Sequence, residues 1–413
     1  MRILSGREAE AMVKRLERRG TRFGRLDPRV RRIVNDVRHS GDRALRRYAQ
    51  RWDGLAASQS LQVSKSEMSA AWDSLPSALR KSLREAESNI RRFCEWQKPK
   101  PWKRSRNGIS LGQLVQPLDS VGCYVPGGRY PLVSTVLMTV IPAQVAGVEN
   151  ICVVSPSPSS QVLGAAAMLG VQKCFRIGGA QSIAALAYGT KSIPRVDKIV
   201  GPGNAYVTAA KKLVSFDCAI DFLAGPTEAL IVSHSGNAEF IAADLVAQGE
   251  HDAEALSLFV TTSGALARAV ADSVKRLAAE NPTAQQSLRK QGAILIADSR
   301  DQEREWANRL ALEHITVESD DLPFIRNAGS VFVGDYSAQA AGDYASGPNH
   351  VLPTSGQARF RGGLSVLDFV KIITVQELTA PGLRRISRAI ESLADAEGLP
   401  AHANSIKVRC AHA

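Results

Sequence analysis

The sequence lacks any apolar run long enough to cross a lipid bilayer. The best candidate, residues 133–148, is interrupted by Pro142 and Gln144, so it predicts a buried helix. No apolar segment follows the first charges at the N-terminus, so a secretory signal peptide is not expected. The prediction is a cytoplasmic protein with no membrane partner.

The chain also lacks a C-x-x-C pair. Its six cysteines lie far apart, at positions 94, 123, 152, 174, 218 and 410, and most fall in apolar, strand-like segments. This distribution is typical of buried, reduced thiols and favours neither a disulfide framework nor a cysteine zinc site. Any metal would therefore need histidine, carboxylate and amide ligands.

The length of 413 residues is too great for one small core, so two or more domains are expected. Much of the net charge of +12 comes from basic residues within 14–51 and 98–106. A basic nucleic-acid-binding protein with a structural metal is one hypothesis, and steeply salt-sensitive binding would test it. Because no aromatic–basic interleaving or reader motif accompanies the charge, solvated helix faces are favoured and no nucleic-acid partner is expected.

Two patterns of hydrophobicity divide the chain. Residues 28–52 and 75–96 have apolar side chains at helical spacing. From Val121 onward, short apolar strands alternate with helices, and a second alternation runs from 239 to 333. This predicts an α/β fold: two Rossmann-like doubly wound parallel-sheet domains, with small helical appendages at the N- and C-termini.

Three predicted strands end in glycine-rich turns, at Pro126-Gly-Gly128, Gly178-Gly179 and Gly201-Pro-Gly-Asn204. Glycine lets the backbone approach a ligand closely, and a helix N-terminus offers free N–H groups to an anion. The turns are therefore candidates for a nucleotide or phosphate site at the carboxyl ends of the strands. None matches G-x-G-x-x-G, so an ordinary Rossmann fingerprint is absent.

Histidine is scarce but unevenly placed. Four of the seven histidines stand near an acid or an amide, as Gln248/His251, Glu313-His314, Asp343/His350 and Glu397/His402. A neutral imidazole can ligate a metal or move a proton near pH 7, and a carboxylate tunes it for either task. A lone histidine is more often a surface or hydrogen-bonded core residue, but the repeated pattern favours a functional site.

Gln248 and His251 are three residues apart at the end of a predicted helix and share one face. With Asp343 and His402 they would form a nitrogen and oxygen ligand set that suits zinc better than calcium or magnesium. The sequence alone does not show that these residues converge. The segment 342–354, which is rich in glycine, proline, asparagine and histidine, is expected to be a functional loop.

Jointly, these motifs resemble those of the histidinol dehydrogenase family. The matching segments are Tyr124-Val-Pro-Gly-Gly128, Gly201-Pro-Gly-Asn-Ala-Tyr-Val207, Ala224-Gly-Pro-Thr-Glu228, Gln248-Gly-Glu-His-Asp252, Gly342-Asp-Tyr-Ala-Ser-Gly-Pro-Asn-His-Val-Leu-Pro-Thr354 and Glu397-Gly-Leu-Pro-Ala-His402. They occur in the family's order and at family-like spacing across nearly the whole chain.

The resemblance implies an oxidoreductase of histidine biosynthesis. Such an enzyme oxidises L-histidinol to L-histidine through L-histidinal in two NAD-dependent steps, with one zinc ion per site, as a homodimer. The expected parts are an N-terminal helical extension (1–22), a discontinuous first α/β domain (23–120 and 230–360), a second, Rossmann-like NAD-binding domain (121–229), and a C-terminal helical dimerisation segment (361–413).

The family pattern also implies roles for individual residues. Glu313 and His314 would be the catalytic acid–base pair, with His314 taking the alcohol proton and Glu313 activating water. The implied zinc ligands are Gln248, His251, Asp343 and His402, with His402 and Glu397 contributed by the other subunit. The implied substrate contacts are Thr227, Gln248, His251, His314, Asp343, His350, Glu397 and His402. The implied NAD contacts are Tyr124, Gln181 and Asn204.

Some positions depart from the family pattern. Leu312 stands where Pro usually precedes Glu-His, and Thr227 replaces the common Ser. Gly249 and Pro348 replace Ala and Thr. Related enzymes oxidise other small polar alcohols, including sulfonated diols, so a zinc- and NAD-dependent paralogue of that kind is the alternative. The presence of both Glu397 and His402 favours histidinol.

Overall fold

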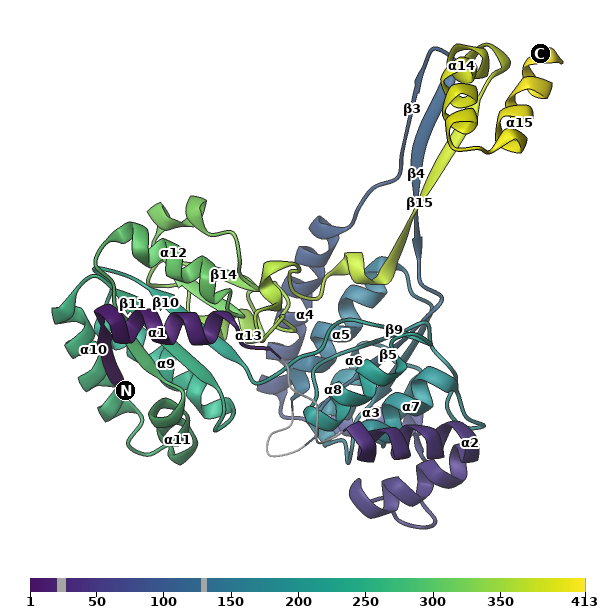
Figure 1. Ribbon diagram of the computed structural model, residues 1–413. Coiled ribbons are helices and arrows are strands. Elements are labelled where there is room, and N and C mark those ends of the chain that lie inside the picture. Colours follow the sequence, from purple (N-terminus) through teal and green to yellow (C-terminus); the bar gives the residue numbers. More distant parts are fainter. Residues whose placement is uncertain (21–26, 128–131, 413) are drawn as a thin grey trace.

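The computed structural model describes residues 1–20, 27–127 and 132–412. Two α/β domains lie side by side, and an arm projects away from them (Figure 1). In the described residues each domain has a six-stranded sheet, and the arm has a three-stranded antiparallel sheet followed by helices. The expected α/β fold class is confirmed. In the same residues, none of the helices has the length and apolar character of a membrane span.

The first domain is built on a parallel sheet. Its strands, in spatial order, are β1 (Arg2–Ser5), β12 (Ala293–Ile296), β11 (Leu256–Thr261), β10 (Glu228–Val232), β13 (His314–Val317) and β14 (Ser330–Val333). Side chains alternate between two hydrophobic cores, so that Leu230 and Val232 enter one core and Ile231 the other. A strand that is apolar on both faces needs helices on both faces.

Two groups of helices cover the two faces of the first sheet. Helices α1 (Gly6–Glu17) and α12 (Arg300–Leu310) supply one core. Helices α9 (Ala238–His251), α10 (Gly264–Leu277) and α11 (Pro282–Lys290) supply the other. Two short elements follow β13 and β14, namely η1 (Ser319–Phe324) and α13 (Gln339–Tyr344).

The second domain has the same plan. Its strands, in spatial order, are β2 (Gln62–Val63), β7 (Lys173–Phe175), β6 (Asn150–Val154), β5 (Ser120–Tyr124), β8 (Lys198–Val200) and β9 (Ala219–Ile220), and only β2 is antiparallel to its neighbour. One face carries α2 (Asp27–Trp52, broken at Gly41), α7 (Gly179–Tyr188) and α8 (Ala205–Val214). The other carries α3 (Lys65–Ser74), α4 (Ser77–Gln97), α5 (Val133–Ala146) and α6 (Ser160–Met168).

The two sheets repeat one topology. Counted from its first central strand, each runs 3-2-1-4-5, with β5 or β10 as strand 1 and β8 or β13 as strand 4. Each sheet also gains an N-terminal edge strand, β1 or β2, beside strand 3. The order reverses between strands 1 and 4, and doubly wound sheets bind ligands at this point, outside the carboxyl ends of the strands. Both switch points are therefore candidate sites.

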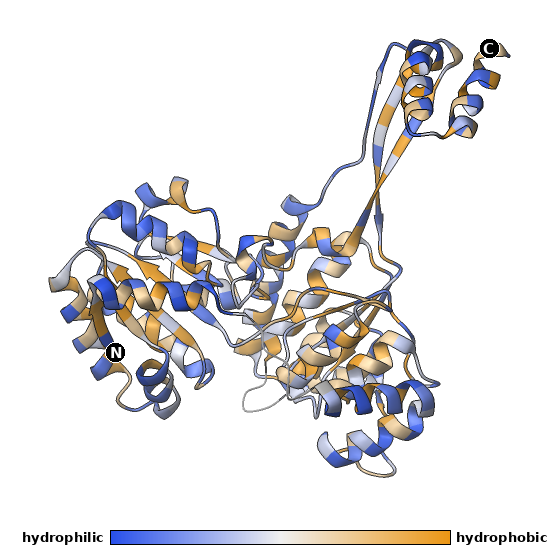
Figure 2. Cartoon of the chain, in the orientation of Figure 1, coloured by the Kyte–Doolittle hydropathy of each residue, from blue (hydrophilic) through white to orange (hydrophobic). Residues whose placement is uncertain are grey.

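The arm consists of β3 (Trp102–Arg106), β4 (Ile109–Pro117) and β15 (Val370–Leu378), which leads to α14 (Ala380–Ala396) and α15 (Pro400–Ala411). Two short turns, η2 (Gln357–Arg359) and η3 (Val366–Phe369), precede it. Figure 2 shows hydrophobic residues along β4 and β15, where these strands project away from the two domains. Among them Ile372 and Leu111 are about half exposed, at 50% and 47%.

The structure differs from the expected N-terminal boundaries. Residues 1–22 were expected as a helical extension, whereas β1 pairs in parallel with β12 and α1 packs in the core of the first domain. Four residues before a helix carry too little pattern to indicate a strand. The expected boundary at 22/23 lies outside the described residues.

Residues 23–120 were expected in the first domain, but the described part of this segment belongs elsewhere. Helices α2, α3 and α4 pack on α7, α6 and α5 of the second domain, and β3 and β4 form the arm. An amphipathic helix shows that it buries a face without showing which sheet receives it. The segment 361–413, expected as helical, includes the strand β15, whose β-branched residues favour extended structure.

A buried ion pair fixes the turn after β8. Lys211 Nζ lies 2.6 Å from Asp221 Oδ1, and the two side chains are only 3% and 1% exposed. Lys211 also donates to the carbonyl of Gly201, while the Gly201 N–H donates to Asp221 Oδ2 at 2.8 Å. Removal of one partner would leave the other charge buried and unpaired.

We expect Lys211→Met to lower the free energy of unfolding by about 3–5 kcal/mol, because Asp221 loses its counter-charge. Urea denaturation followed by circular dichroism measures this change. Lys275→Met, at an exposed position of α10, is the control and should change stability by less than about 0.5 kcal/mol. Equal stability of Lys211→Met and the unmodified protein would contradict the assignment.

Candidate active site

The Glu313-His314 pair lies at the junction of α12 and β13. The helix ends at Leu310, and Ala311 turns the chain with a positive φ of 47°. Glu313 lies on the turn beyond the helix, as expected, while His314 is the first residue of β13. The pair therefore occupies the amino end of strand 4, beside β10, at the edge of the sheet opposite the carboxyl ends.

Both side chains are buried and have specific partners. Glu313 Oε2 accepts hydrogen bonds from the Thr227 hydroxyl at 2.6 Å and from the Glu228 N–H at 2.8 Å. His314 Nδ1 lies 3.3 Å from the Glu228 carbonyl, and its Nε2 lies 3.4 Å from Asp343 Oδ1. Segments from β10, β13 and α13 thus meet around one acid–base pair.

Burial and charge set the protonation of this pair in opposite ways. Burial raises the pKa of Glu313 to about 7, against the opposing effects of His314 and of the two hydrogen bonds. Burial acts to lower the pKa of His314, but the charges of Glu313 and Asp343 outweigh it and raise that pKa to about 9. The site therefore favours an imidazolium beside a carboxyl group that titrates near neutral pH.

The expected metal ligands of the first domain converge only in part. Gln248 is buried on α9 and donates from Nε2 to the Thr227 hydroxyl at 2.6 Å, which leaves its amide oxygen for another partner. His251, the exposed last residue of α9, is close enough to Asp343 to lower the pKa of that carboxyl, together with His314 and His350 and against the effect of burial. Within the described residues, no group of three His, Cys, Asp or Glu could hold a metal ion.

His350 connects the pair to the second domain. Its Nδ1 lies 2.8 Å from the Asp343 carbonyl, and its Nε2 lies 3.5 Å from the Thr135 hydroxyl of α5. The neighbouring Asn349 donates to the Met138 carbonyl at 2.6 Å. The 342–354 segment is therefore a bridge between domains, and its first residues belong to α13 rather than to a loop. Burial lowers the pKa of His350.

Two of the three expected NAD contacts meet at the carboxyl edge of the second sheet. Tyr124 ends β5, and its hydroxyl accepts a hydrogen bond from the Gly179 N–H at 3.3 Å. Gln181 is buried in the first turn of α7 and donates to Asp53 Oδ2 at 3.1 Å. Asn204 is exposed and caps α8 through hydrogen bonds from two backbone N–H groups.

The glycine turns are explained by packing inside the protein. A Cβ at Gly127 would lie 2.5 Å from the Pro156 carbonyl oxygen, and one at Gly201 would lie 2.2 Å from the Tyr124 carbonyl oxygen. A Cβ at Gly178 would strike the Pro156 ring at 2.5–2.8 Å. These contacts account for glycine without any ligand, and Gly128 lies outside the described residues.

Glu397 and His402 lie away from this cluster. Glu397 caps α14, His402 lies on α15, and both are exposed on the projecting arm (Figure 1). Within one chain, therefore, the structure brings together Thr227, Gln248, Glu313, His314, Asp343 and His350, with His251 nearby and the two arm residues separate.

Sequence reasoning missed four residues that shape the site. Arg19 forms a buried ion pair with Glu228, Asp53 orients Gln181, and Asp244 lies near Asp343. Burial, together with the charge of Asp343, raises the pKa of Asp244 to about 6. Glu228 ends the Ala224–Glu228 motif and could have been suspected, but nothing near Arg19 or Asp53 indicates a role.

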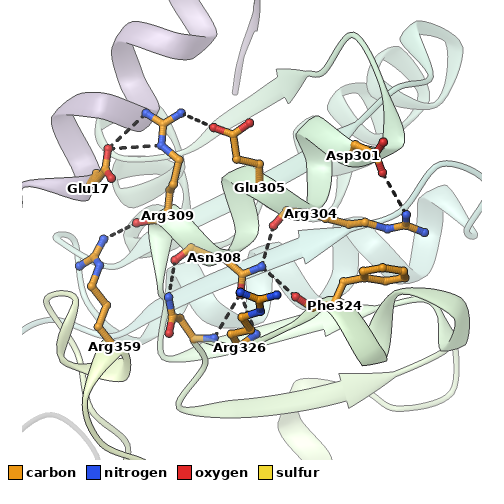
Figure 3. A pocket seen from close by; sticks show the side chains of 10 residues that line it. Glu17, Asp301, Arg304, Glu305, Asn308, Arg309, Phe324, Arg326 and Arg359 are labelled. Atoms are coloured by element: carbon orange, nitrogen blue, oxygen red, sulfur yellow. Dashed lines mark hydrogen bonds and ion pairs between the residues drawn. The ribbon is translucent and has the colours of Figure 1, made fainter.

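A surface cavity of about 530 Å³ lies elsewhere, along the outer side of α12 (Figure 3). Arg304, Arg309 and Phe324 are among the residues that line it. The arginines are largely engaged, Arg304 with Asp301 and Asp321, and Arg309 with acids of α1 and α12. This cavity contains neither Glu313 nor His314, so the candidate active site remains the cluster at the domain junction.

Two α/β domains with parallel sheets, and a buried carboxylate–imidazole pair where they meet, are the arrangement expected of an enzyme that transfers protons. The particular family follows from comparison with known proteins. A model of the histidinol dehydrogenase family matches residues 16–410, and the chain belongs to that family. It is therefore an oxidoreductase, and the resemblance identified from the sequence is confirmed.

Individual relatives lead to the same family. Histidinol dehydrogenase of Methanothermobacter thermautotrophicus is 46% identical over 392 residues, which cover 91% of this chain and 92% of the relative. Histidinol dehydrogenase of Aromatoleum aromaticum is 46% identical over 400 residues, which cover 93% of this chain and 91% of the relative. The crystal structure of histidinol dehydrogenase from Elizabethkingia anophelis superposes with a TM-score of 0.94 at 34% identity, covering 99% of this chain and 98% of that one. The alternative, a paralogue for another alcohol, receives no support.

Thr227 joins the acid–base pair to Gln248, and this predicts the effect of its removal. Thr227→Val deletes a hydrogen bond that favours the Glu313 carboxylate, so the pKa of Glu313 should rise further above its usual range. Buried Gln248 also loses its acceptor, which should cost about 1–3 kcal/mol of stability.

The pH dependence of kcat/KM measures the first effect. If Glu313 acts as a base, activity rises with pH through its pKa, and the rise should move to higher pH in Thr227→Val. Thr227→Ser keeps the hydroxyl and should keep the wild-type profile. A valine variant with an unshifted profile would show that Thr227 does not control Glu313.

Proposed function

We propose that this protein oxidises L-histidinol to L-histidine through L-histidinal, with two molecules of NAD as acceptors. The observation that carries the proposal is the buried network in which Thr227 links Glu313 to Gln248 while His314 lies against Asp343. The relatives named histidinol dehydrogenase support the substrate. The expected cytoplasmic location stays a prediction.

Two proton transfers divide between the two residues of the pair. In the first step the neutral form of His314 accepts the hydroxyl proton of the alcohol at a ring nitrogen as the carbinol C–H bond breaks. Asp343 and Glu313 stabilise the imidazolium that results. In the second step Glu313 removes a proton from the water that adds to the aldehyde, and the hydrated carbon then loses its second C–H hydrogen.

The donor set near Asp343 is suitable for zinc. The Gln248 amide oxygen, the Asp343 carboxylate and the His251 imidazole are hard or borderline donors of the kind that zinc accepts. When bound, NAD supplies the hydride acceptor, and zinc supplies a Lewis acid that anchors the substrate. Tyr124, Gln181 and Asn204 would face NAD, whereas Thr227, His350 and Glu397 would contact the substrate.

A second copy of the chain would complete the site. The arm exposes Leu111, Leu114, Ile372 and Ile373 by 44–50% each, which is more apolar surface than a solvated strand needs. Its tip carries Glu397 and His402. Within one chain, the described residues do not bring either of them near Asp343. We propose a homodimer in which each arm delivers His402 to zinc and Glu397 to the substrate of the partner.

Stoichiometry tests the proposed reaction most simply. Purified protein with limiting histidinol and excess NAD should form two NADH per histidinol, because oxidation of an alcohol to an acid removes two hydrides. A chelator should abolish this activity, and a sulfonated diol should give none. One NADH per histidinol, or a preference for the diol, would refute the proposed reaction or its substrate.

Mixed dimers test the shared site. His402→Ala and Asp343→Ala should each bind little zinc and be inactive alone. After co-expression, half of the random dimers are mixed and have one intact site of two, so about a quarter of wild-type activity should return. The absence of any recovery in purified mixed dimers would place both residues in one chain's site or outside it.

A further inference from the structure

Arg19 lies just beyond α1 and joins the two segments that carry the acid–base pair. Its Nε donates to Glu228 Oε1 and its Nη2 to Glu228 Oε2, each at 2.7 Å. The same guanidinium donates to the carbonyls of Leu310 at 2.6 Å and Ala311 at 3.2 Å. One side chain therefore holds the start of β10 and the C-terminus of α12 together.

Both ends of this link lead directly to the pair. The main chain of Glu228 contacts both members, because its N–H donates to Glu313 Oε2 and its carbonyl lies 3.3 Å from His314 Nδ1. On the other side, Leu310 and Ala311 are followed after one residue by Glu313. A shift of either segment would move the carboxylate relative to the imidazole.

The link is rigid for physical reasons. The Arg19 and Glu228 side chains are 14% and 6% exposed, and two parallel charge-assisted hydrogen bonds fix their relative orientation. The guanidinium also lies against the last carbonyls of α12, where a cation is favoured by the helix dipole. The Ser355 N–H donates to Glu228 Oε1 at 3.1 Å and holds the carboxylate from a third direction.

We propose that Arg19 and Glu228 are positioning residues that set the geometry of the Glu313–His314 pair. This rests on the proposed function, since it assumes that the pair performs the proton transfers. Neither side chain needs to touch the substrate. Their effect passes through the Glu228 main chain and the turn at Ala311.

Arg309 of α12 provides a matched control. Arg309 also joins α1 to α12, through ion pairs with Glu10 at 2.8 Å and Glu17 at 3.2 Å, and it has a further partner in Glu305 (Figure 3). The hydrogen bonds of its guanidinium go to these three acids and not to Glu228. Arg309→Met should therefore weaken the docking of α1 without moving the acid–base pair.

The first readout separates kcat from KM. Arg19→Met should lower kcat by about 10- to 100-fold while KM changes by less than about threefold, because a small displacement of catalytic groups slows chemistry more than binding. Arg309→Met should lower the thermal midpoint while kcat stays within about twofold. Arg19→Lys keeps the charge but loses the fork, so its kcat should lie between Arg19→Met and wild type.

The second readout is the pH profile of kcat. A merely structural role would not move this profile in opposite directions in Arg19→Met and Glu228→Gln. The charged groups facing Glu313 are His314, Glu228 and, beyond the imidazole, Asp343. Arg19→Met removes the cation that is hydrogen-bonded to Glu228 and leaves only the more distant Arg359, so the acid limb of kcat should move to higher pH. Glu228→Gln removes that charge and should move it to lower pH.

Two outcomes would overturn the proposal: wild-type kcat in Arg19→Met, or acid limbs that move in the same direction in both variants. If Arg19→Met does not fold, the comparison of Arg19→Lys with Glu228→Gln decides in the same way. Glu313→Gln separates the two claims. A Glu313→Gln enzyme with wild-type steady-state turnover defeats the proposed function, whereas one without steady-state turnover, beside a fully active Arg19→Met enzyme, defeats only the positioning role.

Discussion

The site depends on the cost of burying the Glu313 carboxyl. A buried carboxylate is tolerated only where donors replace the water it has lost, and here the Thr227 hydroxyl and the Glu228 N–H supply them. These donors come from the start of β10, whereas Glu313 comes from the turn before β13. Pairing of the two strands, with Ala229 opposite His314, is what brings donors and acceptor together. The parallel sheet is therefore the scaffold of the acid–base pair.

The repeated topology assigns different tasks to the two domains. In the second domain the candidate nucleotide residues occupy the carboxyl edge, where Tyr124 ends β5 and Gln181 opens α7. In the first domain the acid–base pair occupies the opposite, amino edge of that domain's own sheet, between strands 1 and 4. His350 and Asn349 then connect the pair to α5 of the second domain. A cofactor held by one sheet could thus meet a substrate held by the other.

Much of this could be predicted from the sequence, for identifiable reasons. Long alternations of strand and helix are strong signals, so the α/β class and most elements from 121 to 333 were predicted, although the strands β10 and β13 were not. Short or solitary features were not: β1 has four residues, and β15 was read as part of a helical segment. Among the site residues, Glu313, His314, Gln248 and Asp343 lie in recognisable motifs, and the fold brings their side chains into one cluster. Arg19 carries none, because one arginine among many in a basic segment has no pattern, and its role depends on a contact 209 positions away.

The division of labour between Glu313 and His314 is the central claim, and a single-turnover experiment tests it most directly. With excess Glu313→Gln enzyme over histidinol and saturating NAD, NADH is followed by stopped-flow absorbance. Because His314 remains to take the alcohol proton, the account predicts rapid formation of one NADH per histidinol and then a stall, as the aldehyde waits for activated water. Formation of both NADH at the wild-type rate would contradict it.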